Sequence, residues 1–250
     1  MKAIIIGAGR GNRLMPLTDG LPKCMLEIGS KTVLDSMLEA LRVSGMDDVV
    51  FIGGYQIEKI KNEYPHLKFC HNTDWQNNNI LTSLFYAEEE MDGAFLASYS
   101  DIIYRRDVVE RLLQSKADIT LVVDTDWRRR YCGRLLHPES QAEKVIVKDD
   151  KVVQIGKHLN SDEAYGEFIG LAKFSKRGAE ILKTTYDEVV DKYQDQSFHQ
   201  AASIQKAYLT DMIQELIDRG HAVHKVDING DWIEIDTEED FERAIKEFGA

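Results

Sequence analysis

The chain has 250 residues, enough to bury the core of one large α/β domain. Its formal net charge of −12 argues against a nucleic acid as the main partner, because a polyanion would be repelled. The three cysteines, Cys24, Cys70 and Cys132, lack the spacing of a metal site, so we expect reduced thiols in a cytoplasmic protein. No apolar run is long enough to span a membrane, and the chain opens as a strand rather than as a signal segment.

Strands and helices alternate through the first half of the chain. The predicted strands are 3–6, 48–53, 67–71, 94–100 and 119–123, and the predicted helices are 32–44, 56–64, 81–91 and 108–115. The short, all-apolar strand at 3–6 suits a central parallel strand that is buried on both faces. Repeated βα units of this length predict an α/β fold with a doubly wound, mostly parallel sheet.

The alternation changes after Asp124. Two short strands, 143–147 and 152–155, flank a charged turn and predict a β-hairpin. The remaining predicted elements are a strand at 167–174, helices at 176–192, 208–218 and 239–248, and a strand at 222–226. The polar stretch 193–205 has no clear assignment and is expected to be a loop over the site. Without repeats or a flexible linker, the prediction is one domain, 1–250, with the hairpin as an elaboration on the substrate side.

A glycine-rich, basic loop directly follows the first strand. It runs Gly7-Ala8-Gly9-Arg10-Gly11-Asn12-Arg13-Leu14, and Lys23 follows a proline shortly afterwards. Small residues let backbone N–H groups approach phosphate oxygens, and Arg10 and Arg13 add cations that suit a triphosphate. Three glycines and three cations favour a phosphate site over a turn with solvated arginines.

Two other phosphate-binding motifs fit this loop less well. A dinucleotide-binding loop requires the third glycine of G-x-G-x-x-G, which this loop lacks, and an acidic residue at the end of the second strand, where Gly53-Gly54-Tyr55 stands. A Walker loop requires G-x-x-x-x-G-K-[ST], which is absent. The loop is therefore a different kind of phosphate site.

The loop resembles the signature of the sugar-phosphate and phosphocholine nucleotidyltransferases. The similarity extends over Gly7 to Leu14, Pro16-Leu17-Thr18 and Leu21-Pro22-Lys23, and is more specific than a lone glycine motif. It implies a Rossmann-like fold and metal-assisted transfer from an NTP. It also implies that Arg13 and Lys23 act catalytically on the phosphates. The nucleotide contacts expected in the loop, from its residues and from the resemblance together, are Ala8, Gly9, Arg10, Gly11, Asn12 and Arg13.

Two aspartates are candidate metal ligands. Asp101 lies just past the carboxyl end of a predicted strand, where open α/β sheets bind ligands, and Asp236 precedes the last helix. Mg²⁺ on a triphosphate takes one or two carboxylates. Asp236 could instead cap the helix and Asp101 could be a surface turn residue, but Thr237 can serve as the cap, with Asp240 completing a capping box. The resemblance implies that both aspartates bind the metal, although sugar-specific relatives often carry two acids where this chain has only Asp101.

An asparagine-rich segment bears on the choice of base. Residues 77–84 are similar to the N-N-I-x-S-L stretch of the phosphocholine cytidylyltransferases, a branch that also handles aminoalkylphosphonates. Amide groups can donate to and accept from a pyrimidine edge. The nucleotide contacts expected here are Asn72, Asn78, Thr82 and Ser83. A polar loop in which Asn79 or Thr82 caps the following helix remains the alternative.

Aromatic and acidic residues are the candidates for acceptor binding. Acceptors of this branch often carry an ammonium or a quaternary amine, which aromatic faces and carboxylates hold. The residues expected at the acceptor are Trp127, Tyr131, Arg129, Glu167, Trp232 and Glu234. The alternatives are that the aromatics belong to the core or to an interface, and that the basic run 128–130 is a solvated surface.

These features together predict a Mg²⁺-dependent cytidylyltransferase. It would transfer CMP from CTP to phosphocholine, 2-aminoethylphosphonate or a related acceptor and release pyrophosphate. The first alternative is a sugar-1-phosphate nucleotidyltransferase that uses UTP, GTP or dTTP. Further alternatives are a non-catalytic nucleotide-binding relative, which the intact Arg13, Lys23, Asp101 and Asp236 disfavour, and a plain dinucleotide-binding module. Because members of the family are often dimers, a homodimer is expected.

Overall fold

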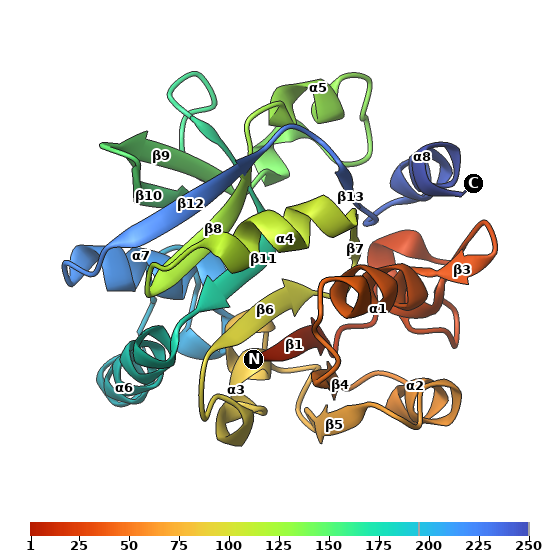
Figure 1. The fold of residues 1–250 in the computed structure, drawn as a ribbon, viewed down its shortest axis with the longest axis horizontal. Coiled ribbons are helices and arrows are strands. Elements are labelled where there is room, and N and C mark those ends of the chain that lie inside the picture. The colour runs from red at the N-terminus through yellow and green to blue at the C-terminus, as the bar shows by residue number, and fades with distance from the viewer. Residues whose placement is uncertain (195, 250) are drawn as a thin grey trace.

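The computed structural model describes residues 1–194 and 196–249. Its main strands are β1 (Lys2–Gly7), β4 (Val49–Gly53), β5 (Lys68–His71), β6 (Phe95–Tyr99), β8 (Ile119–Asp124), β9 (Lys144–Lys148), β10 (Lys151–Gly156), β11 (Gly166–Phe174) and β12 (Val223–Ile228). They form one nine-stranded sheet in the order β5-β4-β1-β6-β11-β8-β12-β10-β9 (Figure 1). Because this sheet draws its strands from most of the chain, we propose that the chain is a single domain.

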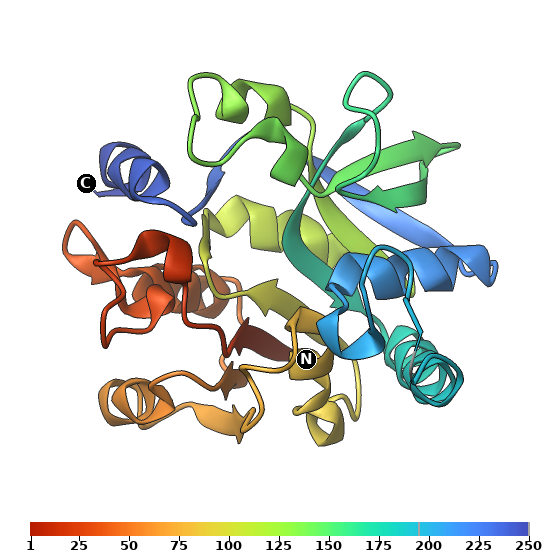
Figure 2. The same ribbon diagram turned by 180° about the vertical axis from the view of Figure 1, so that it is seen from behind.

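Helices cover both faces of the sheet. They are α1 (Val33–Val43), α2 (Ile57–Glu63), α3 (Ile80–Phe85), α4 (Arg106–Gln114), α5 (Trp127–Tyr131), α6 (Lys176–Lys192), α7 (Leu209–Asp218) and α8 (Glu238–Phe248). Helices α1 and α4 contact each other on one face, and α3, α6 and α7 lie together on the other (Figures 1 and 2). Within the described residues, no helix combines the length and the apolar character needed to cross a bilayer.

The predicted doubly wound sheet is confirmed, and it is mixed. Strand β1 lies between β4 and β6 and is parallel to both, with Ile4 opposite Val50 and Ala97. Ile4 is fully buried, as expected for a central parallel strand. Strand β11 is antiparallel to β6 and β8, so the antiparallel share is larger than the alternation of elements indicated. The predicted hairpin is β9–β10.

Two short strands that the sequence did not predict bring distant segments together. Strand β7 (Ile102–Tyr104) pairs antiparallel with β13 (Trp232–Glu234), and the Ile235 N–H donates to the Asp101 carbonyl at 2.9 Å. The chain segments that carry Asp101 and Asp236 therefore lie side by side. A second two-stranded sheet is a small hairpin of β2 (Glu27–Ile28) and β3 (Lys31–Thr32), which the sequence did not predict either. Strands of two or three residues carry too little pattern to be recognised in a sequence.

One helix assignment also differs from the prediction. The predicted helix 81–91 ends at Phe85 and is followed by a separate 3-10 turn, Glu88–Glu90. The helix ends there because the backbone N–H groups of Tyr86 and Ala87 donate hydrogen bonds to carbonyls only three residues earlier. The polar stretch 193–205 includes residue 195, which lies outside the described residues.

A glycine in the middle of β11 supports a wall of the candidate site. Gly170 has a φ of +83° and lies where the register between β11 and β8 shifts. A Cβ added there would overlap the Tyr99 ring. We expect Gly170→Ala to lower the free energy of unfolding by about 2–4 kcal/mol, from backbone strain and overpacking together.

Urea denaturation measures this effect, and Gly93→Ala is the matched control, since a Cβ at Gly93 would meet nothing within 4 Å. Equal stability of the Gly170 and Gly93 variants would contradict the prediction.

Candidate active site

A cavity of about 490 Å³ lies at the carboxyl ends of the parallel strands β1 and β6. One wall comes from the first half of the chain: the loop after β1, Lys23 and the segment around α3. The opposite wall comes from the second half, and Asp101 and Asp236 also line the cavity. This is the position where open α/β sheets bind ligands.

The glycine-rich loop presents open backbone to this cavity. Gly11 has a φ of +72° and precedes a 3-10 turn formed by Asn12–Leu14, and its carbonyl accepts a 2.9 Å hydrogen bond from the Thr18 hydroxyl. A Cβ at Gly9 would meet nothing within 4 Å, so a ligand can approach the backbone there. The predicted loop residues that line the cavity are Ala8, Gly9, Gly11, Asn12 and Arg13.

Arg10 is the exception in this loop. Its guanidinium lies 5.4 Å from the centre of the Tyr55 ring and 3.9 Å from Asp19, and Arg10 does not line the cavity. Arg10 therefore lies outside the cavity lining, although its charge and its place in the loop predicted a nucleotide contact.

Lys23 links the two candidate metal ligands. Its ammonium donates to Asp101 Oδ2 at 2.9 Å and also to Asp236, while Arg13 pairs with the other oxygen of Asp236. Burial opposes the charge on Lys23, but the two carboxylates outweigh it and raise the pKa of Lys23. Burial likewise opposes the charge on Asp236, but Lys23 and Arg13 outweigh it and lower the pKa of Asp236.

Asp101 and Asp236 fit a divalent cation. Both carboxylates reach one ammonium, that of Lys23, so both can reach one small cation. The second oxygen of Asp101, Oδ1, is buried and has no hydrogen-bond partner among the described residues. An unsatisfied carboxylate oxygen at the edge of the cavity is an available ligand for a hard cation, which prefers oxygen.

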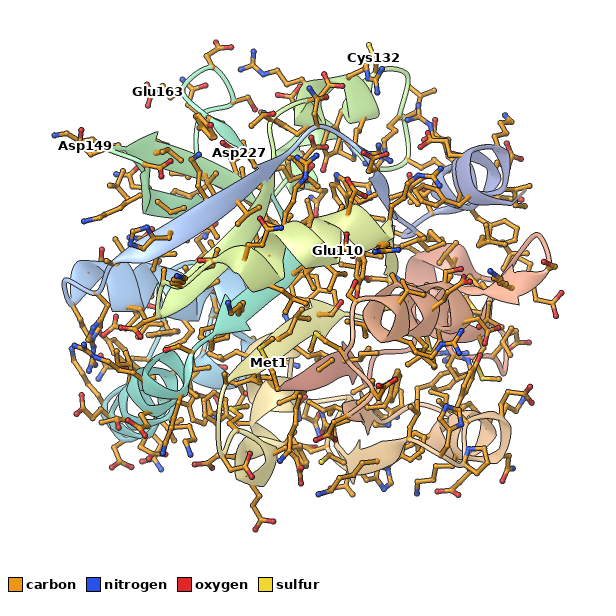
Figure 3. All side chains as sticks on the ribbon, in the orientation of Figure 1. Met1, Glu110, Cys132, Asp149, Glu163 and Asp227 are labelled. Carbon is orange, nitrogen blue, oxygen red and sulfur yellow. The ribbon has the colours of Figure 1, made fainter. Side chains whose placement is uncertain are left out.

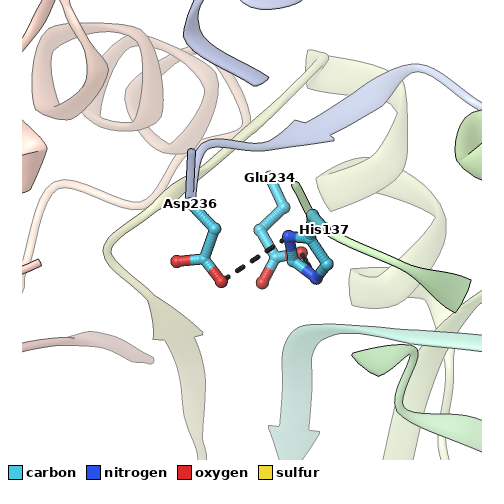
Figure 4. A group of neighbouring side chains, drawn as sticks. All are labelled: His137, Glu234 and Asp236. Carbon is cyan, nitrogen blue, oxygen red and sulfur yellow. Dashed lines mark ion pairs between the residues drawn. The ribbon is translucent and has the colours of Figure 1, made fainter. Parts of the chain in front are cut away.

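A second group of potential ligands shares Asp236. His137, Glu234 and Asp236 offer ligand atoms that lie within 4.8 Å of one another (Figure 4). His137 is buried, and its Nδ1 is 3.3 Å from Asp240 Oδ2. An imidazole ligand suits transition metals better than Mg²⁺. We therefore assign the oxygen-only pair Asp101 and Asp236 as the candidate Mg²⁺ ligands.

The carboxylate of Asp236 is not used to cap α8. Thr237 is the N-cap, its hydroxyl accepts from the Asp240 N–H, and the Asp240 carboxylate accepts from the Thr237 N–H at 3.0 Å. This capping box is the arrangement predicted from the sequence. It leaves the side chain of Asp236 to face Lys23 and the cavity.

The asparagine-rich segment forms a small hydrogen-bond network. Asn72 is fully buried, and its amide group donates to Asn78 and Ser83, each at 2.8 Å. Asn78 and Ser83 line the cavity, so Asn72 orients two lining residues without reaching the cavity itself. Thr82 does not line it either, and Asn79 both caps α3 and lines the cavity. The capping alternative is thus correct for Asn79.

The wall from the second half of the chain is polar and charged. Its lining residues include Gln141, Glu143, Lys157, Tyr208 and Glu234, and Tyr99, the last residue of β6, also lines the cavity. The Tyr99 hydroxyl donates to Glu143 Oε2 at 3.1 Å, and the Lys157 ammonium lies 4.6 Å from the centre of the Tyr208 ring. Burial raises the pKa of Glu143 to about 7 and raises that of Glu234 well above its usual range.

Most of the residues predicted for the acceptor lie elsewhere. Trp127 and Tyr131 pack against each other in a separate buried cluster, and Tyr131 donates to Glu167. The Trp232 indole N–H donates to Asp124 Oδ2 at 2.8 Å, and the exposed Arg129 pairs with Asp126. Only Glu234 of the six predicted acceptor residues lines the cavity. The aromatics are instead buried, Trp232 in the main core and the other two in their own cluster, and burial in a core was the alternative left open.

Several lining residues were not predicted. Gln141, Glu143, Lys157 and Tyr208 come from segments that are far apart in the sequence and share no motif. Trp75 also lines the cavity and meets the Tyr55 ring edge-on at 5.5 Å. Only the folded sheet brings them to one place. The nearest sequence signal was the predicted hairpin, which begins at Glu143 and ends two residues before Lys157.

Comparison with known proteins shows the family of the chain. A family model described as Nucleotidyl transferase matches residues 2–127. A CTP:phosphoglutamine cytidylyltransferase of Campylobacter jejuni is 33% identical over 261 aligned residues, which cover 98% of this chain and 100% of that protein. The chain therefore belongs to the nucleotidyl transferase family, as its loop signature indicated, and is a nucleotidyltransferase.

One further relative and two solved structures are also similar to this chain. A 2-aminoethylphosphonate cytidylyltransferase of Lancefieldella rimae is 26% identical over 74% of this chain and 73% of that protein. The solved CTP:phosphocholine cytidylyltransferase of Streptococcus pneumoniae has a TM-score of 0.71 and 22% identity, covering 98% of this chain and 97% of that chain. The inositol-1-phosphate CTP transferase of T. maritima has a TM-score of 0.73 and 21% identity, covering 100% and 97%. These structures confirm the Rossmann-like fold.

Proposed function

We propose that this enzyme transfers CMP from CTP to a small phosphorylated or phosphonate acceptor and releases pyrophosphate, with Mg²⁺ as the metal. The observation that carries the proposal is the cavity itself. An open glycine-rich backbone, Arg13 and Lys23 face two carboxylates that can hold one cation. The cytidylyltransferase names of the relatives favour CTP over other nucleotides.

The reaction is an attack by an oxygen of the acceptor's phosphate on the α-phosphorus of CTP. A new P–O bond forms, the bond between the α-phosphorus and its bridging oxygen to the β-phosphorus breaks, and pyrophosphate departs with that oxygen. The attacking oxygen is already ionised at neutral pH, so positioning and charge neutralisation are the main requirements. Arg13 and Lys23 bind the phosphates of CTP. A Mg²⁺ ion held by Asp101 and Asp236 would neutralise phosphate charge.

Lys157 is our candidate for binding the acceptor's phosphate. It lines the cavity, and its ammonium forms no carboxylate ion pair within the described residues. The other two cations of the cavity, Arg13 and Lys23, are already paired with aspartates. Burial opposes the charge on Lys157, but nearby acidic groups, Glu143 foremost, outweigh it and raise its pKa. Lys157 therefore stays charged and available to an anion.

The base of the nucleotide would contact the cavity wall that the first half of the chain forms. Asn78 and Ser83 supply side-chain hydrogen-bond donors and acceptors, and Gly9 supplies the polar groups of its backbone. The buried Asn72 holds Asn78 and Ser83 in place. A pyrimidine is smaller than a purine and can be recognised by its amide-like edge, which agrees with the proposal of CTP.

Pyrophosphate release with each NTP tests the proposal. The panel crosses CTP, UTP, GTP and dTTP with phosphoethanolamine, phosphocholine, 2-aminoethylphosphonate, phosphoglutamine and several sugar 1-phosphates, with and without Mg²⁺. We expect Mg²⁺-dependent release with CTP and a phosphorylated amine or an aminoalkylphosphonate. Release with a sugar 1-phosphate alone would replace the proposal with the sugar-nucleotide alternative. Nucleotide binding without release from any pair would favour a non-catalytic relative.

A further inference from the structure

The charged residues of the cavity form pairs, with two exceptions. Four carboxylates line it: Asp101, Glu143, Glu234 and Asp236. Asp101 and Asp236 contact Lys23, and Glu234 lies 3.5 Å from His137 and 3.9 Å from Arg134. Within the described residues, Glu143 has no basic side chain within ion-pair distance, although it is only 8% exposed.

The two unpaired charges lie on the same wall but do not pair with each other. Lys157 and Glu143 both line the cavity, and each influences the pKa of the other. No ion pair joins them in the part of the chain that the structure describes, and Lys157 lies over the Tyr208 ring instead. A buried carboxylate, that of Glu143, and a half-buried ammonium, that of Lys157, do not pair and so leave room for a ligand with both signs of charge.

On the wall that carries Glu143, the two tyrosine rings that line the cavity already contact other side chains. A cation without N–H groups is held by ring faces. Tyr99 directs its hydroxyl to Glu143 and packs its ring against Phe168, while the Tyr208 ring is covered by Lys157. The aromatics expected to surround a quaternary amine lie outside the cavity. A cation that reaches Glu143 would therefore be recognised through its N–H groups.

We propose that Glu143 binds a primary ammonium group on the acceptor while Lys157 binds its phosphate, so that the enzyme selects zwitterionic phosphorylated amines over phosphocholine. This inference rests on the proposed function and adds the class of acceptor to it. Glu143 is then the residue that sets specificity. Phosphoethanolamine, 2-aminoethylphosphonate and phosphoglutamine each carry the required ammonium, whereas the three methyl groups of phosphocholine remove every N–H donor.

Three acceptors and two variants test this assignment. Phosphoethanolamine, phosphocholine and 2-hydroxyethyl phosphate differ only at the nitrogen end, where they carry a primary ammonium, a quaternary ammonium and a hydroxyl. Glu143→Gln keeps the size of the side chain and its hydrogen bond with Tyr99 but removes the charge. Glu163→Gln is the matched control, since Glu163 is exposed in the loop between β10 and β11, at the edge of the molecule (Figure 3).

We expect the unmodified enzyme to prefer phosphoethanolamine over phosphocholine by about 10- to 100-fold in kcat/KM, the range for a hydrogen bond to a charged group. Glu143→Gln should lose about the same factor with phosphoethanolamine but little with 2-hydroxyethyl phosphate. Glu163→Gln should change neither. Equal rates with phosphocholine and phosphoethanolamine, or an equal loss with all three acceptors in Glu143→Gln, would overturn the inference. An equal loss with all three acceptors would mean that Glu143 only balances the charge of Lys157 and does not contact the acceptor.

A binding measurement separates this inference from the proposed function. Calorimetry with phosphoethanolamine, Mg²⁺ and a non-hydrolysable CTP analogue reports acceptor binding without turnover. Weaker binding to Glu143→Gln than to Glu163→Gln supports the inference even if no pyrophosphate is released, in which case only the proposed reaction fails. Equal binding to both variants contradicts the inference even if CTP is consumed. Thermal unfolding of both variants verifies that they are folded.

Discussion

Asp101→Asn is expected to lower kcat by about 100-fold or more and to raise the Mg²⁺ concentration that gives half-maximal activity. The amide keeps the shape of the side chain but loses the negative charge that holds a divalent cation. It also leaves Lys23 with one carboxylate partner in place of two. Steady-state rates of pyrophosphate release, measured across a Mg²⁺ titration, give both quantities.

The matched control for this prediction is Asp92→Asn. Asp92 is exposed and pairs with Lys2 at the surface, so its replacement should leave kcat and the Mg²⁺ requirement unchanged. If Asp101→Asn kept full activity with an unchanged Mg²⁺ requirement, the assignment of Asp101 as a metal ligand would be wrong.

Lys23→Met should have an effect of similar size on kcat, about 100-fold or more, because the methionine cannot bind the departing pyrophosphate. It should also destabilise the protein without Mg²⁺. The side chain of Lys23 is 12% exposed and that of Asp236 is 8% exposed, so the substitution leaves two carboxylates close together without their shared cation. The expected loss in the free energy of unfolding is about 3 kcal/mol or more.

Added Mg²⁺ distinguishes this explanation from simple loss of packing. In Lys23→Met, a divalent cation can replace the missing positive charge, so Mg²⁺ should raise the thermal midpoint of the variant more than that of the unmodified protein. Lys31→Met is the control, because Lys31 pairs with Glu39 at the surface. A Lys23 variant with normal stability and no response to Mg²⁺ would contradict the account of the ion cluster.

The sequence predicted those parts of the fold in which local pattern and local structure agree. The apolar run at 3–6 is the buried centre of β1, and the capping box of Thr237 and Asp240 begins α8. The pairing of β7 with β13 could not be predicted, because strands of three residues carry no periodicity. The direction of β11 also depends on which neighbours it meets in the folded sheet and not on its own residues.

The candidate site likewise has one part that the sequence predicted and one part that it did not. The four residues Arg13, Lys23, Asp101 and Asp236 were predicted from their positions in the sequence and from the family resemblance, and the fold brings all four together. The acceptor wall has no motif. Trp127, Tyr131 and Trp232 were plausible by composition, but an aromatic residue near a strand end serves a core as readily as a binding site. Glu143 was not predicted as a binding residue, because an acidic residue at the start of a predicted hairpin gives no sign of such a role until its burial is known.

The most direct test of the proposed reaction follows an isotope label. Phosphoethanolamine with ¹⁸O in its phosphate is incubated with CTP, Mg²⁺ and the enzyme, and the products are analysed by mass spectrometry. The account predicts CDP-ethanolamine that carries the ¹⁸O atoms, together with unlabelled pyrophosphate in equal amount. Hydrolysis of CTP without any CMP joined to the acceptor, or ¹⁸O in the pyrophosphate, would contradict an attack by the acceptor's phosphate on the α-phosphorus of CTP.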